Sequence, residues 1–445
     1  MLTFLAFLFA IALLVFVHEF GHYWVARKCG VGVLTFSIGF GKPIYQWQRG
    51  ETRWQIAMIP LGGFVRMMDE REAAVASESQ TRAFNRQHPL KKMAVVVAGP
   101  VANLLFAILA FSLCYMLGVQ SLKPQVLTVQ PGSLAQLAGI QAGDRIVALN
   151  NQKIESWDQF QLMMFDVAGN KQVVLKLKNQ EGLNKQVNLP IGKLSAEQYD
   201  QHLLDRLGLS PFASLRSIAY LQPEGAGLAA GLQVNDEIVA INQHPVKDWS
   251  TVQQLVMEYG KSALVITVKR QNELLTIVAK PRLESVDGVV LPRLGMAPQS
   301  DIVRNQQQVI QVKLEPLDAF GHGLDKTYQM SLMTLSMFGK MIGGILSPRQ
   351  VSGPIGIAQY AGQSAAMGVI AYLQFLALIS ISLGVLNLLP IPILDGGHLL
   401  YHSYELLTGR EPSLFLTEWL QKLGIILLLM LMALALFNDT SRLLG

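Results

Sequence analysis

Four long apolar stretches dominate the pattern of hydrophobic and polar positions along the chain. They cover residues 2–24, 94–118, 368–394 and 423–437. The second and third contain no charged side chain, and a helix that crosses the roughly 30 Å hydrocarbon core of a bilayer needs about 20 apolar residues. The pattern therefore predicts a polytopic α-helical membrane protein. Its four transmembrane helices are expected within residues 1–32, 93–118, 366–398 and 416–438.

The first apolar stretch also contains the small-residue pattern Ala10-Ile-Ala12, which is typical of the cleavage site of a secretion signal. No Lys or Arg precedes the stretch, however, and the apolar run continues past Ala12 to His18. We therefore expect a retained span rather than a cleaved leader.

The charged residues, 15% of the chain against 51% hydrophobic, are placed unevenly. Residues 25–92 hold eleven Lys or Arg against five Asp or Glu, and loops rich in Lys and Arg stay in the cytosol. This orientation places the segment after residue 118 on the far side of the membrane. The basic residues are spread among apolar residues and Gly, so we expect no nucleic-acid partner. Cys29 lies beside a span and Cys114 within one, and a structural disulfide is therefore not expected.

A sequence repeat lies between the second and third apolar stretches. Residues 131–144 align with residues 223–236 at a constant offset of 92 (223 − 131), and Trp157 aligns with Trp249 at the same offset. Each copy predicts a helix that ends at a glycine, an acidic turn, an alternating strand and a second helix after the Trp. The repeat therefore predicts two copies of one domain fold in tandem.

The pattern of both copies resembles that of PDZ domains, with the departure that Asn235 stands where the pattern has glycine. Asn tolerates left-handed backbone angles better than most residues, so the turn should survive. The resemblance implies two PDZ domains of the α+β class, mostly β, at 124–212 and 213–300. Such domains bind extended chain ends by adding a strand to a sheet edge. The segments 206–211 and 293–298 fit carboxylate-binding loops and plain strands equally well.

The sequence His18-Glu19-Phe-Gly-His22 places ionisable side chains in the last turns of the first apolar stretch. Residues four apart share one face of a helix, so both imidazoles reach one cation while Glu19 lies near water at that cation. Ionisable groups are expensive in a membrane span and rarely remain there without a function. The motif predicts a Zn²⁺ site with His18 and His22 as ligands and Glu19 as the catalytic base. Coincidence, or a proton relay without metal, is the alternative.

A third ligand is predicted where the third apolar stretch ends. Pro390 and Pro392 cannot continue a helix, and non-helical backbone at membrane depth is tolerated only where protein or water covers it. Asp395 then faces a protected cavity and adds a carboxylate oxygen to two imidazole nitrogens, which leaves a fourth position open, as in catalytic zinc sites. His398 and His402 are also four residues apart, but no acid follows His398 directly. We expect these two to pack or to support the site.

His-Glu-x-x-His in a first span, Leu-Asp-Gly at 394–396 and a PDZ pair between them resemble the site-2 protease family of intramembrane zinc metalloproteases. The resemblance covers nearly the whole chain. It includes Gly39-Phe-Gly41, Leu61-Gly-Gly63, Gly99-Pro100, Ser352-Gly-Pro354 and Phe437-Asn-Asp439. It implies a zinc-dependent protease in the cytoplasmic membrane of a bacterium, with its active site toward the cytosol and its PDZ domains in the periplasm.

The resemblance further implies that Asn387 binds substrate beside the metal. Residues 33–92 correspond to a cytosolic loop with a membrane-associated β-hairpin, in which Gly39 and Gly41 bind substrate, although an ordinary loop hairpin would show the same Gly-rich alternation. A transmembrane helix must unwind before it is cut, and a strand edge can receive the unwound segment. The implied substrates are single-span membrane proteins, namely a trimmed anti-sigma factor and remnant signal peptides. Membrane lipid is the other expected partner.

Residues 330–346 are apolar and Met-rich, with Lys340 as their only charge, so they fit either a fifth span or a helix on the membrane surface. A fifth crossing would place Asp395 on the side opposite His18 and His22. The metal site therefore requires a surface helix, which we expect within residues 317–350.

Two functions from other classes compete with proteolysis. A membrane-anchored PDZ scaffold or chaperone that cuts nothing accounts for the repeat but not for the ionisable side chains in the membrane. A metal transporter would use the histidines and the aspartate, but it needs neither PDZ domains nor a Glu beside the first ligand. The combination of motifs therefore favours the protease.

Overall fold

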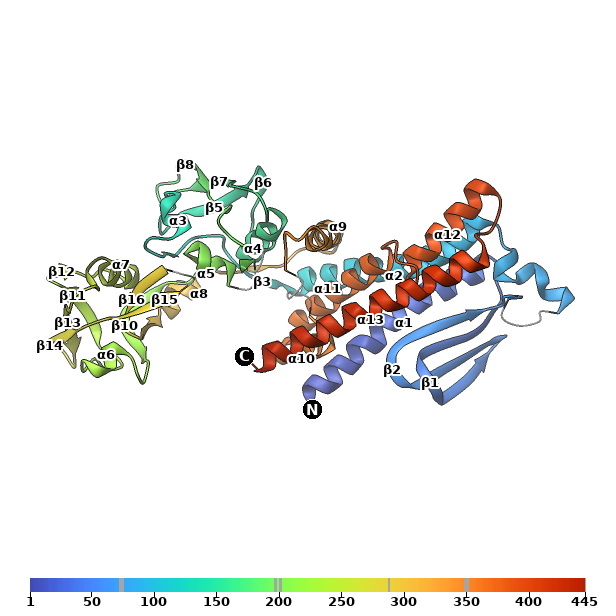
Figure 1. Ribbon diagram of the computed structural model, residues 1–445, viewed down its shortest axis with the longest axis horizontal. Helices are drawn as coiled ribbons and strands as arrows, with labels where there is room; N and C mark the ends of the chain where they lie inside the picture. Colours follow the sequence, from blue (N-terminus) through green and yellow to red (C-terminus); the bar gives the residue numbers. More distant parts are fainter. Residues whose placement is uncertain (72–75, 196–197, 200–201, 287–288, 348–351, 445) are drawn as a thin grey trace. The chain divides into compact units, whose positions relative to one another are not determined.

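The computed structural model of the chain describes residues 1–71, 76–195, 198–199, 202–286, 289–347 and 352–444 (Figure 1). It divides into two compact units. The first comprises Met1–Val119, Val312–Ile342 and Pro348–Gly445, and the second comprises Gln120–Gln311 and Gly343–Ser347. The predicted loop, both predicted PDZ domains and the predicted surface-helix region each include a few residues outside the described ranges, such as 348–350 at the end of the last.

The first unit is built around long apolar helices. Four described helices are long and apolar enough to cross a membrane, as the sequence predicts. They are α1 (Leu2–Lys28), α2 (Pro89–Leu117), α11 (Val369–Asn387) and α13 (Leu414–Leu444). Helix α2 packs against α1 and α11, and begins at Pro89, where the missing backbone N–H leaves no partner unsatisfied.

The third span is shorter than the predicted range 366–398. Helix α10 (Pro354–Met367) ends before Gly368, which has a φ of 114°, and α11 ends at Asn387. A new helix, α12 (Asp395–Thr408), begins at the predicted third ligand. Pro390 and Pro392 lie in the non-helical segment between α11 and α12, in agreement with the expectation that the chain leaves helical geometry there.

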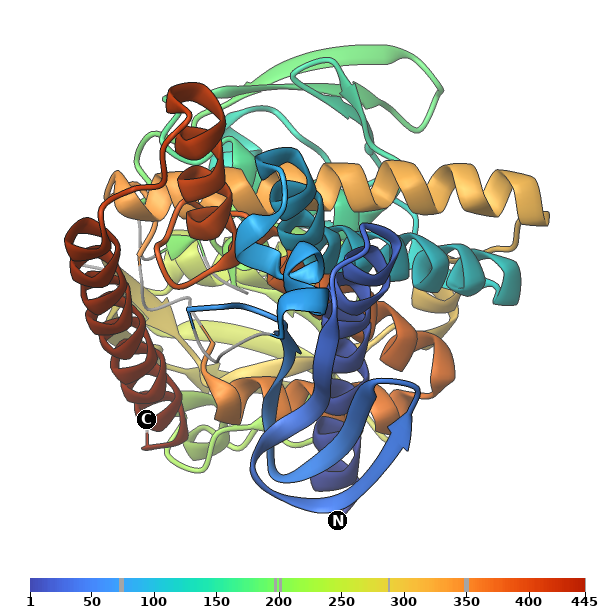
Figure 2. The ribbon, with the colours of Figure 1, turned by 90° about the vertical axis from the view of Figure 1, so that its right-hand side faces the viewer.

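Helix α9 (Pro316–Ile342) is not among the described helices that are apolar enough to cross a membrane. It is seen end-on in Figure 1, where α1 and α13 run lengthwise, and lengthwise in Figure 2. It therefore lies across the bundle, where it packs on α2 with Gly323 against Ser112. Exposed apolar residues follow one another at helical spacing along it: Leu317, Phe320, Leu324, Tyr328, Leu332 and Leu335. That α9 lies on the membrane surface stays a prediction.

Strands β1 (Val33–Arg49) and β2 (Thr52–Met67) form a long antiparallel hairpin beside α1 (Figure 2). Each strand bends, so that residues 33–38 pair on one side with 63–67 and on the other with 53–56. The folded hairpin therefore has two outer edges, formed by residues 63–67 and 45–49. Two short 3-10 helices, η1 (Ser77–Arg82) and η2 (Phe84–Arg86), lead from it to α2.

The second unit contains two domains of one design, as the repeat predicts. In the first copy the strand order is β6-β5-β7-β8. In the second copy β12-β11-β13-β14 repeats this order, and β10 and β17 extend the sheet beside β11. The buried acid of each copy accepts a hydrogen bond from the backbone three residues before it, from Gln141 to Asp144 and from Gln233 to Asp236. Asn235 has a φ of 72°, which confirms that Asn takes the left-handed position of this turn.

The elements of the first copy are β4 (Thr128–Val129), α3 (Leu134–Leu137), β5 (Arg145–Leu149), β6 (Gln152–Lys153), α4 (Trp157–Asp166), β7 (Val173–Lys178), β8 (Asn184–Leu189), α5 (Leu203–Leu207) and β9 (Leu209–Ser210). Those of the second are β10 (Ser214–Leu221), α6 (Ala226–Ala229), β11 (Glu237–Ile241), β12 (His244–Pro245), α7 (Trp249–Tyr259), β13 (Leu264–Arg270), β14 (Glu273–Ala279), β15 (Arg282–Val286), β16 (Val289–Arg293) and β17 (Met296–Ser300). The chain also contains α8 (Ile302–Gln306), and β3 (Val119–Leu122) pairs with β18 (Val309–Val312) where the chain enters and leaves this unit.

Candidate metal centre

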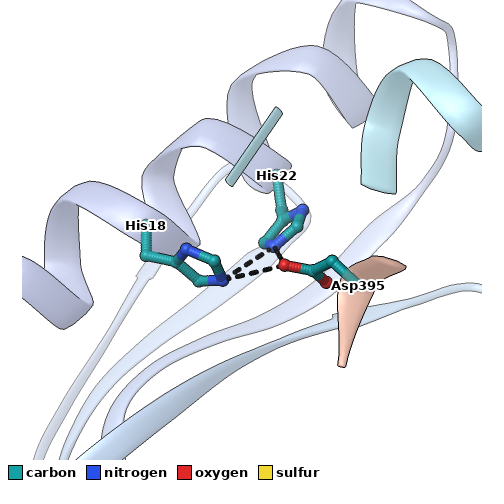
Figure 3. Close-up of side chains that lie close together, drawn as sticks. All are labelled: His18, His22 and Asp395. Carbon is teal, nitrogen blue, oxygen red and sulfur yellow. Dashed lines mark hydrogen bonds and ion pairs between the residues drawn. The ribbon is translucent and has the colours of Figure 1, made fainter. Parts of the chain in front are cut away.

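Three predicted ligands meet at the end of α1 and the start of α12 (Figure 3). Nε2 of His18 lies 3.2 Å from Oδ2 of Asp395, and Nε2 of His22 lies 3.6 Å from the same oxygen. The two Nε2 atoms are 3.2 Å apart. These side chains come from positions more than 370 residues apart in the sequence (395 − 22 = 373), so the fold brings together what the sequence motifs predict.

The geometry fits a zinc ion. At metal–ligand distances of about 2.0–2.2 Å, tetrahedral coordination separates neighbouring ligand atoms by about 3.3–3.6 Å. The three observed separations of 3.2, 3.2 and 3.6 Å lie in this range or about 0.1 Å below it. Oδ2 of Asp395 is buried and has no hydrogen-bond donor among the described residues, which a metal ion would explain. Two imidazoles and one carboxylate also leave a fourth coordination position open, as catalytic zinc requires.

Close packing of α1 on α2 sets the position of the imidazoles. A Cβ atom at Gly21 would lie 2.8 Å from Cβ of Ala102 and overlap the backbone oxygen of Ala98. A Cβ atom at Gly99 would lie 2.8 Å from Cε1 of His18 and overlap the ring of His22. The two glycines therefore let the helix backbones approach until the ligand rings rest on the backbone of α2.

Helix α2 and the end of α11 also contact the ligands. Nδ1 of His22 is 2.8 Å from the backbone oxygen of Val95, and Nδ1 of His18 is 3.3 Å from Nδ2 of Asn103. On the metal side, Nδ2 of Asn387 lies 3.5 Å from Nε2 of His18. The predicted substrate residue Asn387 is thus beside the metal centre.

Glu19 lines a cavity of about 540 Å³ together with His22 and Asp395. A Cβ atom at Gly63, on one outer edge of the folded hairpin, would lie 3.0 Å from Cγ of Glu19. The predicted catalytic base therefore shares a cavity with two of the predicted ligands and lies against a sheet edge.

His398 and His402 line the same cavity but are not part of the described ligand cluster. Burial lowers the pKa of both imidazoles, and a hydrogen bond with Glu405 partly opposes this effect at His402. Glu405 also accepts a 2.8 Å hydrogen bond from Lys92, a buried lysine at the start of α2. Burial raises the pKa of the Glu405 carboxyl, but its hydrogen bonds with Lys92 and His402 hold the pKa below its ordinary value.

Gly39 and Gly41, which the family resemblance connects with substrate, are not among the residues that line this cavity. They lie with φ of 92° and 86° where β1 bends, and a Cβ atom at Gly39 would be 2.8 Å from the oxygen of Ile59. Their role in substrate binding stays a prediction. The sequence interpretation missed Asn103 and Lys92, although an Asn inside an uncharged span was a visible signal.

Comparisons with known proteins show to which family the chain belongs. A model of peptidase family M50 matches residues 6–431. The chain is 37% identical to the regulator of sigma-E protease RseP of Escherichia coli over 453 aligned residues, which cover all of both chains. It is 38% identical to the RseP of Salmonella typhimurium and 39% identical to the protease RseP of Yersinia pestis, each over 98% of both chains. The chain therefore belongs to peptidase family M50, the site-2 type of intramembrane zinc metalloprotease.

Proposed function

We propose that His18, His22 and Asp395 hold the zinc ion of this protease and that Glu19 is its catalytic base, acting on single-span membrane proteins. The observation that carries the proposal is the convergence of two imidazoles and a carboxylate at tetrahedral spacing, at the end of an apolar span. A scaffold or chaperone would have no use for this arrangement.

The residues around the ligands have separate tasks in the proposed reaction. Bound Zn²⁺ supplies Lewis-acid activation of water and of the scissile carbonyl. Glu19, on the wall of the cavity, takes a proton from the attacking water and delivers it to the leaving amine. Asn387 has an amide N–H₂ group 3.5 Å from Nε2 of His18, where it can donate to the developing oxyanion of the substrate.

The edge of the folded hairpin near Glu19 is the proposed place for the substrate. Residues 63–67 pair with β1 along one side and form an outer edge of the folded hairpin, where we propose that an unwound segment binds by strand addition. Gly63 lies against Glu19, and this contact with the proposed base supports the choice of this edge. Gly39 and Gly41 lie where β1 bends. In this proposal they contribute to substrate binding because the bend shapes the edge.

The substrate class follows from the relatives, whose names describe proteases that regulate sigma-E. By this relation the chain cuts a trimmed anti-sigma factor in the cytoplasmic membrane, and remnant signal peptides are further candidates. The two repeat domains are proposed to be periplasmic PDZ domains. In the second, a cavity of about 490 Å³ lies between α7 and the segment 293–297, lined by Val252, Val256 and Leu294, and we propose it as a peptide-binding groove.

Co-expression of the full chain with a truncated single-span anti-sigma factor tests the proposal. Glu19→Gln should abolish cleavage and keep the zinc content of the purified protein, whereas Asp395→Ala should lose both. Glu418→Gln, an exposed glutamate in the span α13, is the matched control and should cleave normally. Unimpaired cleavage by Glu19→Gln would show that Glu19 is not the base, and a wild-type chain without zinc would refute the metal site.

A further inference from the structure

Asn103 is a buried polar residue of α2. Its side chain faces His18, a proposed metal ligand, but is not itself one of the proposed ligands. It is fully buried within the span, and its Nδ2 atom lies 3.3 Å from Nδ1 of His18. Its Oδ1 atom is also buried and has no hydrogen-bond partner among the described residues. An amide in an apolar helix with an unused acceptor is costly unless the site uses it.

The tautomer of His18 determines what this amide can do. Nε2 of His18 faces Asp395 and His22, and a nitrogen that binds a metal must present its lone pair there. In a neutral imidazole the hydrogen then sits on Nδ1, which makes Nδ1 a donor. An amide N–H₂ group opposite an imidazole N–H would bring two donors together at 3.3 Å, which is unfavourable.

A half-turn of the amide resolves this conflict. The oxygen and nitrogen of an asparagine side chain exchange places on rotation and have nearly the same shape. Because Oδ1 has no partner in its present position, the rotation breaks no hydrogen bond at that atom. It places an acceptor opposite the N–H of His18, so a repulsive contact becomes a hydrogen bond.

The second imidazole already shows this arrangement. Nδ1 of His22 lies 2.8 Å from the backbone oxygen of Val95, and a carbonyl oxygen can only accept, so Nδ1 of His22 carries the hydrogen. Val95, Gly99 and Asn103 are spaced four apart and lie on one face of α2. After the rotation of Asn103, this face would supply an acceptor to each imidazole, with a glycine between them.

We propose that Asn103 is a positioning residue that accepts a hydrogen bond from His18 and thereby holds its Nε2 lone pair toward the zinc ion. The inference rests on the proposed metal site. Partners of this kind orient a metal-bound imidazole and increase its basicity, and their loss typically lowers metal affinity about 10- to 100-fold. Asn103 acts through His18 and has no contact with substrate in this assignment.

Zinc affinity of the purified full chain in detergent, measured by chelator competition, tests the proposal with two variants of similar shape. Asn103→Asp keeps an acceptor and loses the donor, and Asn103→Leu removes both. We expect Asn103→Asp to bind zinc within a few-fold of wild type and Asn103→Leu to bind it about 10- to 100-fold more weakly. Ser112→Ala, which alters another buried polar residue of α2, should leave the affinity unchanged.

The absorption spectrum of the Co²⁺-substituted protein is a second readout, because its d–d bands report the ligand geometry rather than stability. Asn103→Leu should shift these bands and Asn103→Asp should retain them. Equal loss of affinity in both variants, or wild-type affinity and spectrum in Asn103→Leu, would overturn the assignment. Absence of zinc from the wild-type protein would instead count against the metal site itself.

Discussion

Replacement of Gly99 by alanine tests how closely the metal centre depends on the packing of α1 against α2. A Cβ atom at this position would lie 2.6 Å from Cε1 of His22 and 2.8 Å from Cε1 of His18, whereas ordinary van der Waals contact begins at 3.4 Å. Nε2 of His22 would lie closer still, so the rings must retreat by more than about 0.8 Å, or the helices must separate by a similar amount. Metal sites tolerate distance errors of only about 0.2 Å.

We expect Gly99→Ala to weaken zinc binding by about 100-fold and to lower the cleavage rate at least as much, because misplacement of reacting groups by about 1 Å has effects of this size. Overpacking should also lower the free energy of unfolding by roughly 1–3 kcal/mol. Chelator competition and cleavage of a single-span substrate in detergent measure the two effects. Gly339→Ala is the control, since that helical glycine has open space around it. Wild-type zinc affinity in Gly99→Ala would refute the close packing described for the ligand rings.

Three further predictions concern contacts around the site. Lys92→Met should lower the free energy of unfolding by roughly 3 kcal/mol, because it leaves Glu405 without its buried cation. The pKa of Glu405 is lowered from 4.5, so the stabilisation by this pair is complete above pH 4.5 and fades as the pH falls through the pKa of the folded state. The dependence of the thermal unfolding temperature on acid pH should therefore be flatter in the variant than in the wild type. Asp439→Ala should speed amide exchange at the start of α10, since this carboxylate accepts three backbone N–H bonds there, and unchanged exchange would contradict the contact. Asn387→Leu should keep its zinc yet lower kcat about 100-fold with little change in KM; loss of zinc would instead assign Asn387 to metal binding.

The sequence was most informative where residues that can bind a metal also follow a regular helical spacing or a helix break. His18 and His22 were predictable because a spacing of four places both on one helix face, and Asp395 because two prolines break the helix just before it. Lys92 lies at the edge of the second apolar stretch and was taken only as a topology signal, although it pairs with a glutamate 313 residues away. Asn103 was not predicted because its side chain is an uncharged amide, and the prediction of the site relied on ionisable residues in the apolar stretches. Partners that only the fold brings together leave no periodic signal in a single sequence.

The metal centre constrains the path of the chain through the membrane. His22 lies in the last turns of α1 and Asn387 is the last residue of α11, so both spans end at the centre and run in the same direction, while α2 returns between them. The chain between α2 and α11 must therefore leave and re-enter the membrane on one side, which excludes a single crossing by α9. The placement of α9 across the bundle meets this condition (Figure 2).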